Sequence, residues 1–83
     1  MRIVWDEPKR LANIDKHGFD LAEVNNEFLA EATFFPAKLG RIGALAAFRG
    51  ILMTAIIEPL GTEAIAMISF RHASEKERRD YWS

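Results

Sequence analysis

Residues 42 to 70, IGALAAFRGILMTAIIEPLGTEAIAMISF, decide the fold of this chain. They contain three mainly apolar runs of strand length, Ile42 to Phe48, Ile51 to Glu58 and Glu63 to Phe70. Short segments that contain glycine, Arg49-Gly50 and Pro59-Leu60-Gly61-Thr62, separate the runs, as hairpin turns require. The stretch therefore predicts an antiparallel meander.

Two further strands are expected before this region. Met1 to Trp5 has the composition of a short strand. Phe34 to Lys38 is typical of an edge strand, because Pro36 has no N–H to donate to a neighbour. The last two strands of the meander are apolar at nearly every position, so both sheet faces need cover. Two helices cover only one face, and we expect the other to remain available.

The first helix is marked by signals at both ends. Asp6-Glu7-Pro8 is a helix start, and Gly18 suits the left-handed position after a helix. This helix is expected to turn three apolar side chains toward the core, namely Leu11, Ala12 and Ile14.

A second and a third helix follow from similar signals. Asp20 and Glu23 form a potential capping box before apolar residues at helical spacing, which are Leu21, Val24, Phe28 and Ala32. Ser74 and Glu77 form another box before a short charged helix. The order β-α-α-β-β-β-β-α predicts an α+β fold, in which two N-terminal helices pack on one face of an antiparallel sheet.

Composition limits the function classes. The chain has 83 residues, 49% of them hydrophobic, and a net charge of −1, which fits one folded domain, 1–83. A dedicated nucleic-acid-binding protein is usually more basic, so any contact with nucleic acid would use a local cationic patch.

Cysteine is absent and histidine occurs twice, so the composition does not predict a structural metal site. The N-terminus reaches Asp6 before an apolar signal region forms, and no apolar run approaches the roughly 20 residues of a membrane span. We expect a cytoplasmic protein that contacts no membrane and uses no metal or cofactor.

Cations and imidazoles lie at the ends of the expected elements, where a rigid scaffold can present them to solvent. They are Lys9, Lys16, His17, Arg71, His72, Arg78 and Arg79. Structural roles are the alternative interpretation of these residues. Lys16 and His17 suit the end of a helix dipole, and Arg71 suits an ion pair with a glutamate of the second helix. Arg78 and Arg79 suit a solvated helix face.

Two blocks of sequence resemble the BrnT family, the toxins of a bacterial type II toxin–antitoxin system. The first is Trp5-Asp6-Glu7-x-Lys9-Arg10-x-x-Asn13-x-x-Lys16-His17-Gly18-x-Asp20. The second is Ile68-Ser69-Phe70-Arg71-His72-Ala73-Ser74, followed by Glu77-Arg78 and Tyr81, and Phe28 and Arg41-x-Gly43 lie between the blocks. The resemblance covers nearly the whole chain.

The resemblance implies a RelE-like fold and a metal-independent endoribonuclease that suppresses translation. It also implies a ribbon-helix-helix antitoxin, BrnA-like, through which the toxin would reach DNA only indirectly. Within this interpretation Lys16, His17, Arg71 and His72 are the candidate catalytic residues, and the candidate substrate-binding residues are Lys9, Arg78 and Tyr81.

The chain also departs from the family pattern. Ala66 and Pro59-Leu60 stand where cations are common, and His72 stands where Lys or Arg is usual. Because cations stabilise the charge of a phosphoryl transition state, two other interpretations stay open. One is a catalytically weakened module that binds the antitoxin as a co-repressor, and the other is a homo-oligomer that uses the available sheet face.

Overall fold

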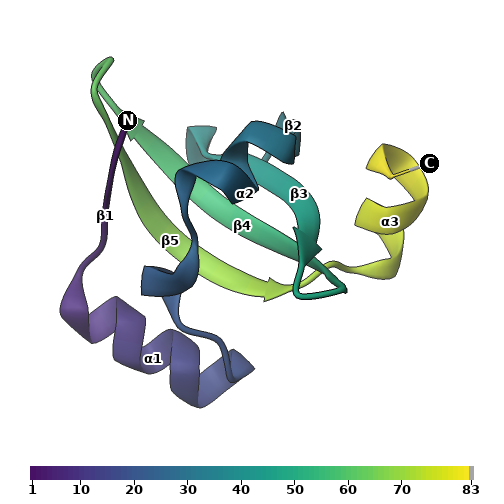
Figure 1. The fold of residues 1–83 in the computed structure, drawn as a ribbon, viewed down its shortest axis with the longest axis horizontal. Helices are drawn as coiled ribbons and strands as arrows, with labels where there is room; N and C mark the ends of the chain where they lie inside the picture. Colours follow the sequence, from purple (N-terminus) through teal and green to yellow (C-terminus); the bar gives the residue numbers. More distant parts are fainter. Residues whose placement is uncertain (83) are drawn as a thin grey trace.

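A computed structural model describes residues 1–82, which form one sheet with helices on both sides and at its edge (Figure 1). No helix in this range is long and apolar enough to cross a membrane. The strands are β1 (Arg2–Val4), β2 (Thr33–Pro36), β3 (Ile42–Phe48), β4 (Ile51–Leu60) and β5 (Ala64–His72). The helices are α1 (Glu7–His17), α2 (Asn26–Glu31) and α3 (Glu75–Tyr81), with 3-10 turns η1 (Leu21–Glu23) and η2 (Lys38–Gly40).

The sheet has the strand order β1-β5-β4-β3-β2. The predicted meander is confirmed, since β2, β3, β4 and β5 pair antiparallel in succession. The prediction of a wholly antiparallel sheet is wrong, because β1 pairs with β5 in parallel, with Arg2 opposite Ala64. Parallel neighbours need a long connection, and here most of the chain separates the two strands.

The hairpin between β3 and β4 follows directly from local chemistry. Arg49 and Gly50 have φ angles of 50° and 80°, which suit the two-residue turn between the paired Phe48 and Ile51. At the other end of β4, Pro59 lies beyond Ile57, where the pairing with β3 ends, so its missing N–H breaks no ladder on that side.

The core lies between one sheet face and the segment from η1 to α2 (Figure 1). Leu21, Val24, Phe28 and Leu29 pack there against apolar side chains of β3, β4 and β5, which are Ala44, Ala46, Met53, Ala55, Ile57, Met67 and Phe70. The predicted second helix is interrupted. Asp20 caps only the 3-10 turn, and Asn25 starts α2 afresh by accepting a hydrogen bond from the Phe28 N–H at 2.9 Å.

Helix α1 lies at the edge of the sheet near β1 and β5, and not on the face that α2 covers (Figure 1). Leu11 and Ile14 are 56% and 37% exposed, so the prediction that they enter the core is wrong. The buried residue of α1 is Asn13. The two N-terminal helices therefore occupy different places around the sheet.

The second sheet face is partly covered. Leu45 and Thr54 pair across β3 and β4 on this face and are fully buried. Thr54 donates its hydroxyl hydrogen to Glu77 of α3 at 2.9 Å. A Cβ added at Gly43 would lie 2.2 Å from the Phe35 ring, so that ring lies directly over the glycine. Helix α3 and Phe35 thus occupy part of the face that the sequence predicts to be available.

Candidate functional site

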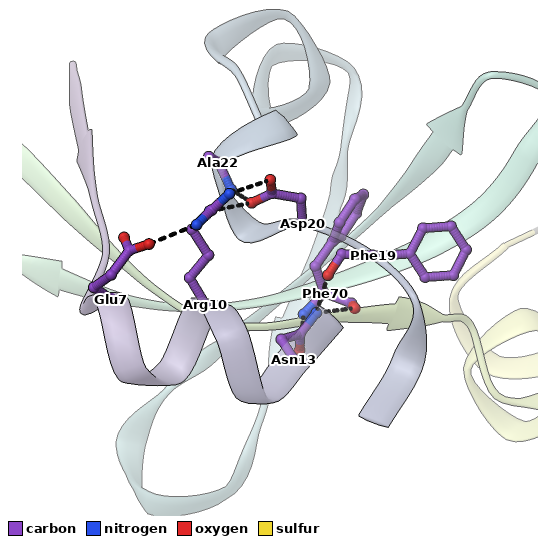
Figure 2. A network of polar contacts seen from close by, with 7 residues as sticks. All are labelled: Glu7, Arg10, Asn13, Phe19, Asp20, Ala22 and Phe70. Carbon is purple, nitrogen blue, oxygen red and sulfur yellow. Dashed lines mark hydrogen bonds and ion pairs between the residues drawn. The ribbon is translucent and has the colours of Figure 1, made fainter. Parts of the chain in front are cut away.

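Asn13 fastens α1 to the edge of the sheet (Figure 2). Its amide group donates to the carbonyl oxygens of Phe19 and Phe70, at 2.7 and 2.8 Å. Its side-chain oxygen accepts from the Phe70 N–H at 3.1 Å and from the Ser69 hydroxyl at 3.3 Å. Since β1 pairs only with Ala64 to Ala66, Asn13 takes the place of a neighbouring strand at Phe70.

Arg10 makes a second connection from α1 (Figure 2). Its guanidinium binds both carboxylate oxygens of Asp20, at 2.9 and 3.0 Å, and it also pairs with Glu7. The same Asp20 accepts from the Ala22 N–H, and these contacts lower the pKa of the Asp20 carboxyl group. Together, Asn13 and Arg10 fix the position of the helix that carries three of the candidate site residues.

Those three residues, Lys9, Lys16 and His17, line one pocket of about 340 Å³, here named the α1 pocket. Its other lining residues are Ala12, Asn13, Arg41, Ile68 and Ser69. Strand β5 has a bulge at Ile68, which is one of the lining residues. Ile56 pairs with Ser69 and Ile57 with Met67, so Ile68 has no partner in β4. Such bulges redirect side chains, and they are common beside active sites.

The surroundings of the His17 imidazole favour its neutral form. Partial burial lowers its pKa below the ordinary value, and the positive charges of Lys16 and Arg71 lower it further. The neutral imidazole therefore predominates at neutral pH, which is the form that a general base needs.

Arg71 and Tyr81 line a second, larger pocket of about 630 Å³, here named the α3 pocket. Its charged and aromatic lining residues are Phe35, Lys38, Arg41, Arg71, Lys76, Glu77 and Tyr81. The Phe35 and Tyr81 rings stack with their centroids 4.5 Å apart and an interplanar angle of 10°. Lys16 and Arg71 thus lie in separate pockets, which adjoin at Arg41.

Arg71 makes a bidentate ion pair with Glu77 of α3, with N–O distances of 2.8 and 2.9 Å. Its partner is therefore not a glutamate of the second helix. The predicted capping box is confirmed, since Glu77 accepts from the Ser74 N–H and donates its own N–H to the Ser74 hydroxyl. The Arg71 guanidinium is the main cause that lowers the Glu77 pKa to about 2, and the Ser74 and Thr54 hydrogen bonds contribute.

The remaining two candidates lie outside both pockets. His72 pairs with Met53, a core residue, and its ring lies 5.1 Å from the Phe19 ring. Because side chains alternate along a strand, His72 and Arg71 point to opposite faces of β5. Arg78 lies on α3 and lines neither pocket.

Arg41 is the site residue that the sequence reasoning missed, although it belongs to the Arg41-x-Gly43 pattern. It follows η2 and lines both pockets. Its Nε atom is buried and has no hydrogen-bond partner within residues 1–82. A buried N–H without a partner is costly, so the position of Arg41 is not explained by a bond from this atom within the described part of the chain.

The fold and the site define a class of small α+β proteins that gather several cations and an imidazole in one pocket beside a sheet edge. A family model described as the ribonuclease toxin BrnT of type II toxin–antitoxin systems matches residues 5–77. This match covers most of the chain, and the chain belongs to the BrnT family. The resemblance predicted from the two sequence blocks is confirmed.

A solved structure supports the same assignment. The 1.1 Å crystal structure of the ribonuclease toxin BrnT of Brucella abortus is 47% identical, with a TM-score of 0.83. The similarity covers 90% of this chain and 99% of that chain. A comparison with curated protein sequences finds no match.

Proposed function

We propose that this chain is a metal-independent endoribonuclease that suppresses translation by cleaving RNA in the α1 pocket. The main support for the proposal is that Lys9, Lys16, His17 and Arg41 line one pocket in a chain of the BrnT family. A neutral imidazole can accept the proton of the ribose 2′-hydroxyl, and three cations can stabilise the charge that develops on the phosphate during phosphodiester cleavage.

The roles follow from charge and protonation. His17 accepts the proton of the 2′-hydroxyl, whose oxygen then attacks the adjacent phosphorus atom. Lys16 and Arg41 stabilise the negative charge that develops on the phosphate oxygens. The leaving 5′-oxygen takes a proton from an ammonium group of the pocket or from water. Lys9 helps to hold the strand, and Arg71 contributes by keeping the His17 pKa low.

We further propose a cytoplasmic ribbon-helix-helix antitoxin, BrnA-like, as the protein partner. A type II antitoxin is a protein, so membership of the family supports a protein partner. This partner, and not the toxin, would contact operator DNA, since the chain has a net charge of −1.

The experiment is RNA cleavage by the purified chain, freed of any antitoxin, in buffer with EDTA. We expect cleavage at an unchanged rate when EDTA replaces Mg²⁺, with products that end in a 2′,3′-cyclic phosphate. Intact RNA in both buffers would favour the co-repressor interpretation, and cleavage only with added metal would contradict the proposed chemistry.

A further inference from the structure

We propose that the α3 pocket is a nucleotide-binding subsite for single-stranded RNA. It would hold the nucleotide next to the phosphate that is cleaved in the α1 pocket. This inference rests on the proposed function and extends it from the reacting phosphate to the neighbouring base. Of the groups assigned to the reaction only Arg41, at the junction of the two pockets, lines the α3 pocket, so the rest of this pocket contributes to binding and specificity.

The first argument is the position of Arg41. It contributes to the walls of both pockets, so a strand that occupies both of them must pass this guanidinium. Its Nε–H has no partner within residues 1–82, so no carboxylate holds the guanidinium through this atom, and the part of the side chain that lines the pockets can bind a phosphate oxygen between two nucleotides.

The second argument is the chemistry of the α3 pocket itself. The stacked Phe35 and Tyr81 rings form an apolar part of the pocket wall, and 36% of the Tyr81 surface remains exposed. Every base presents a π-face, so an exposed aromatic ring binds single strands with little dependence on sequence. The volume of about 630 Å³ is within the range of about 300–1,000 Å³ of small-ligand pockets.

The third argument is charge. Four cations line the α3 pocket, Lys38, Arg41, Arg71 and Lys76, against one carboxylate, Glu77, which Arg71 already neutralises. Lys38 makes no ion pair within the described part of the chain, and the pair of Lys76 with Asp80 is on the surface. The aromatic wall and the surplus positive charge of the α3 pocket suit a nucleotide better than they suit an apolar or a basic side chain of a protein.

The test uses short RNAs of increasing length. A dinucleotide fills the α1 pocket, and trinucleotides extended on the 5′ or the 3′ side add one base. For the unmodified protein we expect one of the two extensions to raise kcat/KM about 10-fold or more, as stacking of one base would. The Tyr81→Leu and Lys38→Ala variants should lower this trinucleotide-to-dinucleotide ratio toward one, whereas Tyr81→Phe, which keeps the ring, should preserve it.

A purely structural role for Tyr81 would lower both rates together and leave the ratio unchanged, and this result would overturn the proposal. Equal rates for all three substrates would also overturn it, and they are expected if the pocket holds a side chain of a protein partner. Arg79→Ala, on an exposed part of α3 outside both pockets, is the matched control and should keep the ratio.

Binding of uncleavable 2′-deoxy oligonucleotides separates this inference from the proposed function. If RNA is not cleaved, the proposed function fails, yet the deoxy trinucleotide should still bind about 10-fold more tightly than the deoxy dinucleotide. Tyr81→Leu should remove that difference. Equal dissociation constants for the two lengths would overturn the subsite whatever the result for cleavage.

Discussion

Replacing Asn13 by alanine tests how α1 is held against the sheet. The change removes the partner of three backbone groups, the N–H and C=O of Phe70 and the C=O of Phe19. The two bonds to Phe70 are buried, and the bond to Phe19 is partly buried. The Asn13 amide donates to the Phe70 carbonyl and accepts from the Phe70 N–H, so a replacement would need a donor and an acceptor at the same place. We expect no other side chain to meet this requirement.

The magnitude follows from the cost of leaving buried polar groups without partners. Each such group costs about 1–3 kcal/mol, and the partly exposed Phe19 carbonyl costs less because water can reach it. We therefore expect Asn13→Ala to lower the free energy of unfolding by about 2–4 kcal/mol. For a domain of this size the midpoint of thermal unfolding should fall by at least about 10 °C.

Urea unfolding followed by circular dichroism measures this loss, with Asn26→Ala as the matched control. The Asn26 amide is exposed and donates only to the Met1 carbonyl, at 3.1 Å, so its loss should cost less than about 1 kcal/mol. If Asn13→Ala unfolds within about 0.5 kcal/mol of the unmodified protein, the amide does not secure α1 and the reasoning is refuted.

Three further predictions concern the pockets. Arg71→Met removes a cation that lowers the His17 pKa, so the acidic limb of the kcat/KM profile should move to higher pH; an unmoved limb would contradict an electrostatic effect of Arg71 on a His17 base. Glu77→Gln should lower the free energy of unfolding at pH 7 by about 1–2 kcal/mol after allowance for solvent screening. Folding lowers the Glu77 pKa from 4.5 to about 2, so the carboxylate stabilises the folded state above pH 4.5 and this stabilisation is lost as the pH falls toward 2. The variant should therefore lose less stability than the unmodified protein when urea unfolding is repeated at acid pH. The same pH dependence in both proteins would contradict the ion pair. Gly43→Ala should displace the Phe35 ring and cost about 1–3 kcal/mol in the same assay, and a neutral result would contradict the contact.

The hairpin turns and two of the helix caps could be predicted from sequence because their causes are local, whereas Asp20 caps only a 3-10 turn. Arg49 and Gly50 adopt the left-handed angles that their turn needs, Gly18 ends α1, and Ser74 and Glu77 form their box. The pairing of β1 with β5 has no such local cause. It depends on contacts between residues more than 60 positions apart, such as Arg2 and Ala64.

The prediction that α1 turns Leu11 and Ile14 into the core was wrong for a related reason. Apolar periodicity favours Leu11 and Ile14 as inward residues, but a helix at a sheet edge meets free backbone groups as well as apolar side chains. A polar residue, Asn13, therefore occupies the buried position. A sequence pattern does not reveal which strand edge will need such a partner.

The candidate site was predictable only where its members are close in the chain. Lys9, Lys16 and His17 share one helix and do line one pocket. Arg41 comes from a different part of the chain, and only the folded arrangement brings it to the same pocket. The separation of His72 from Arg71 follows from strand alternation once β5 is known to extend to His72.

The most direct test of the central claim is the single-turnover rate of RNA cleavage by Lys16→Ala in EDTA, compared with the unmodified protein at pH 7. Removal of a group that stabilises the charged transition state should lower the rate by about 100-fold or more. Because Lys16 is exposed, the thermal unfolding midpoint should stay nearly unchanged. A Lys16→Ala variant that folds normally and cleaves at the unmodified rate would contradict the assignment of catalysis to the α1 pocket.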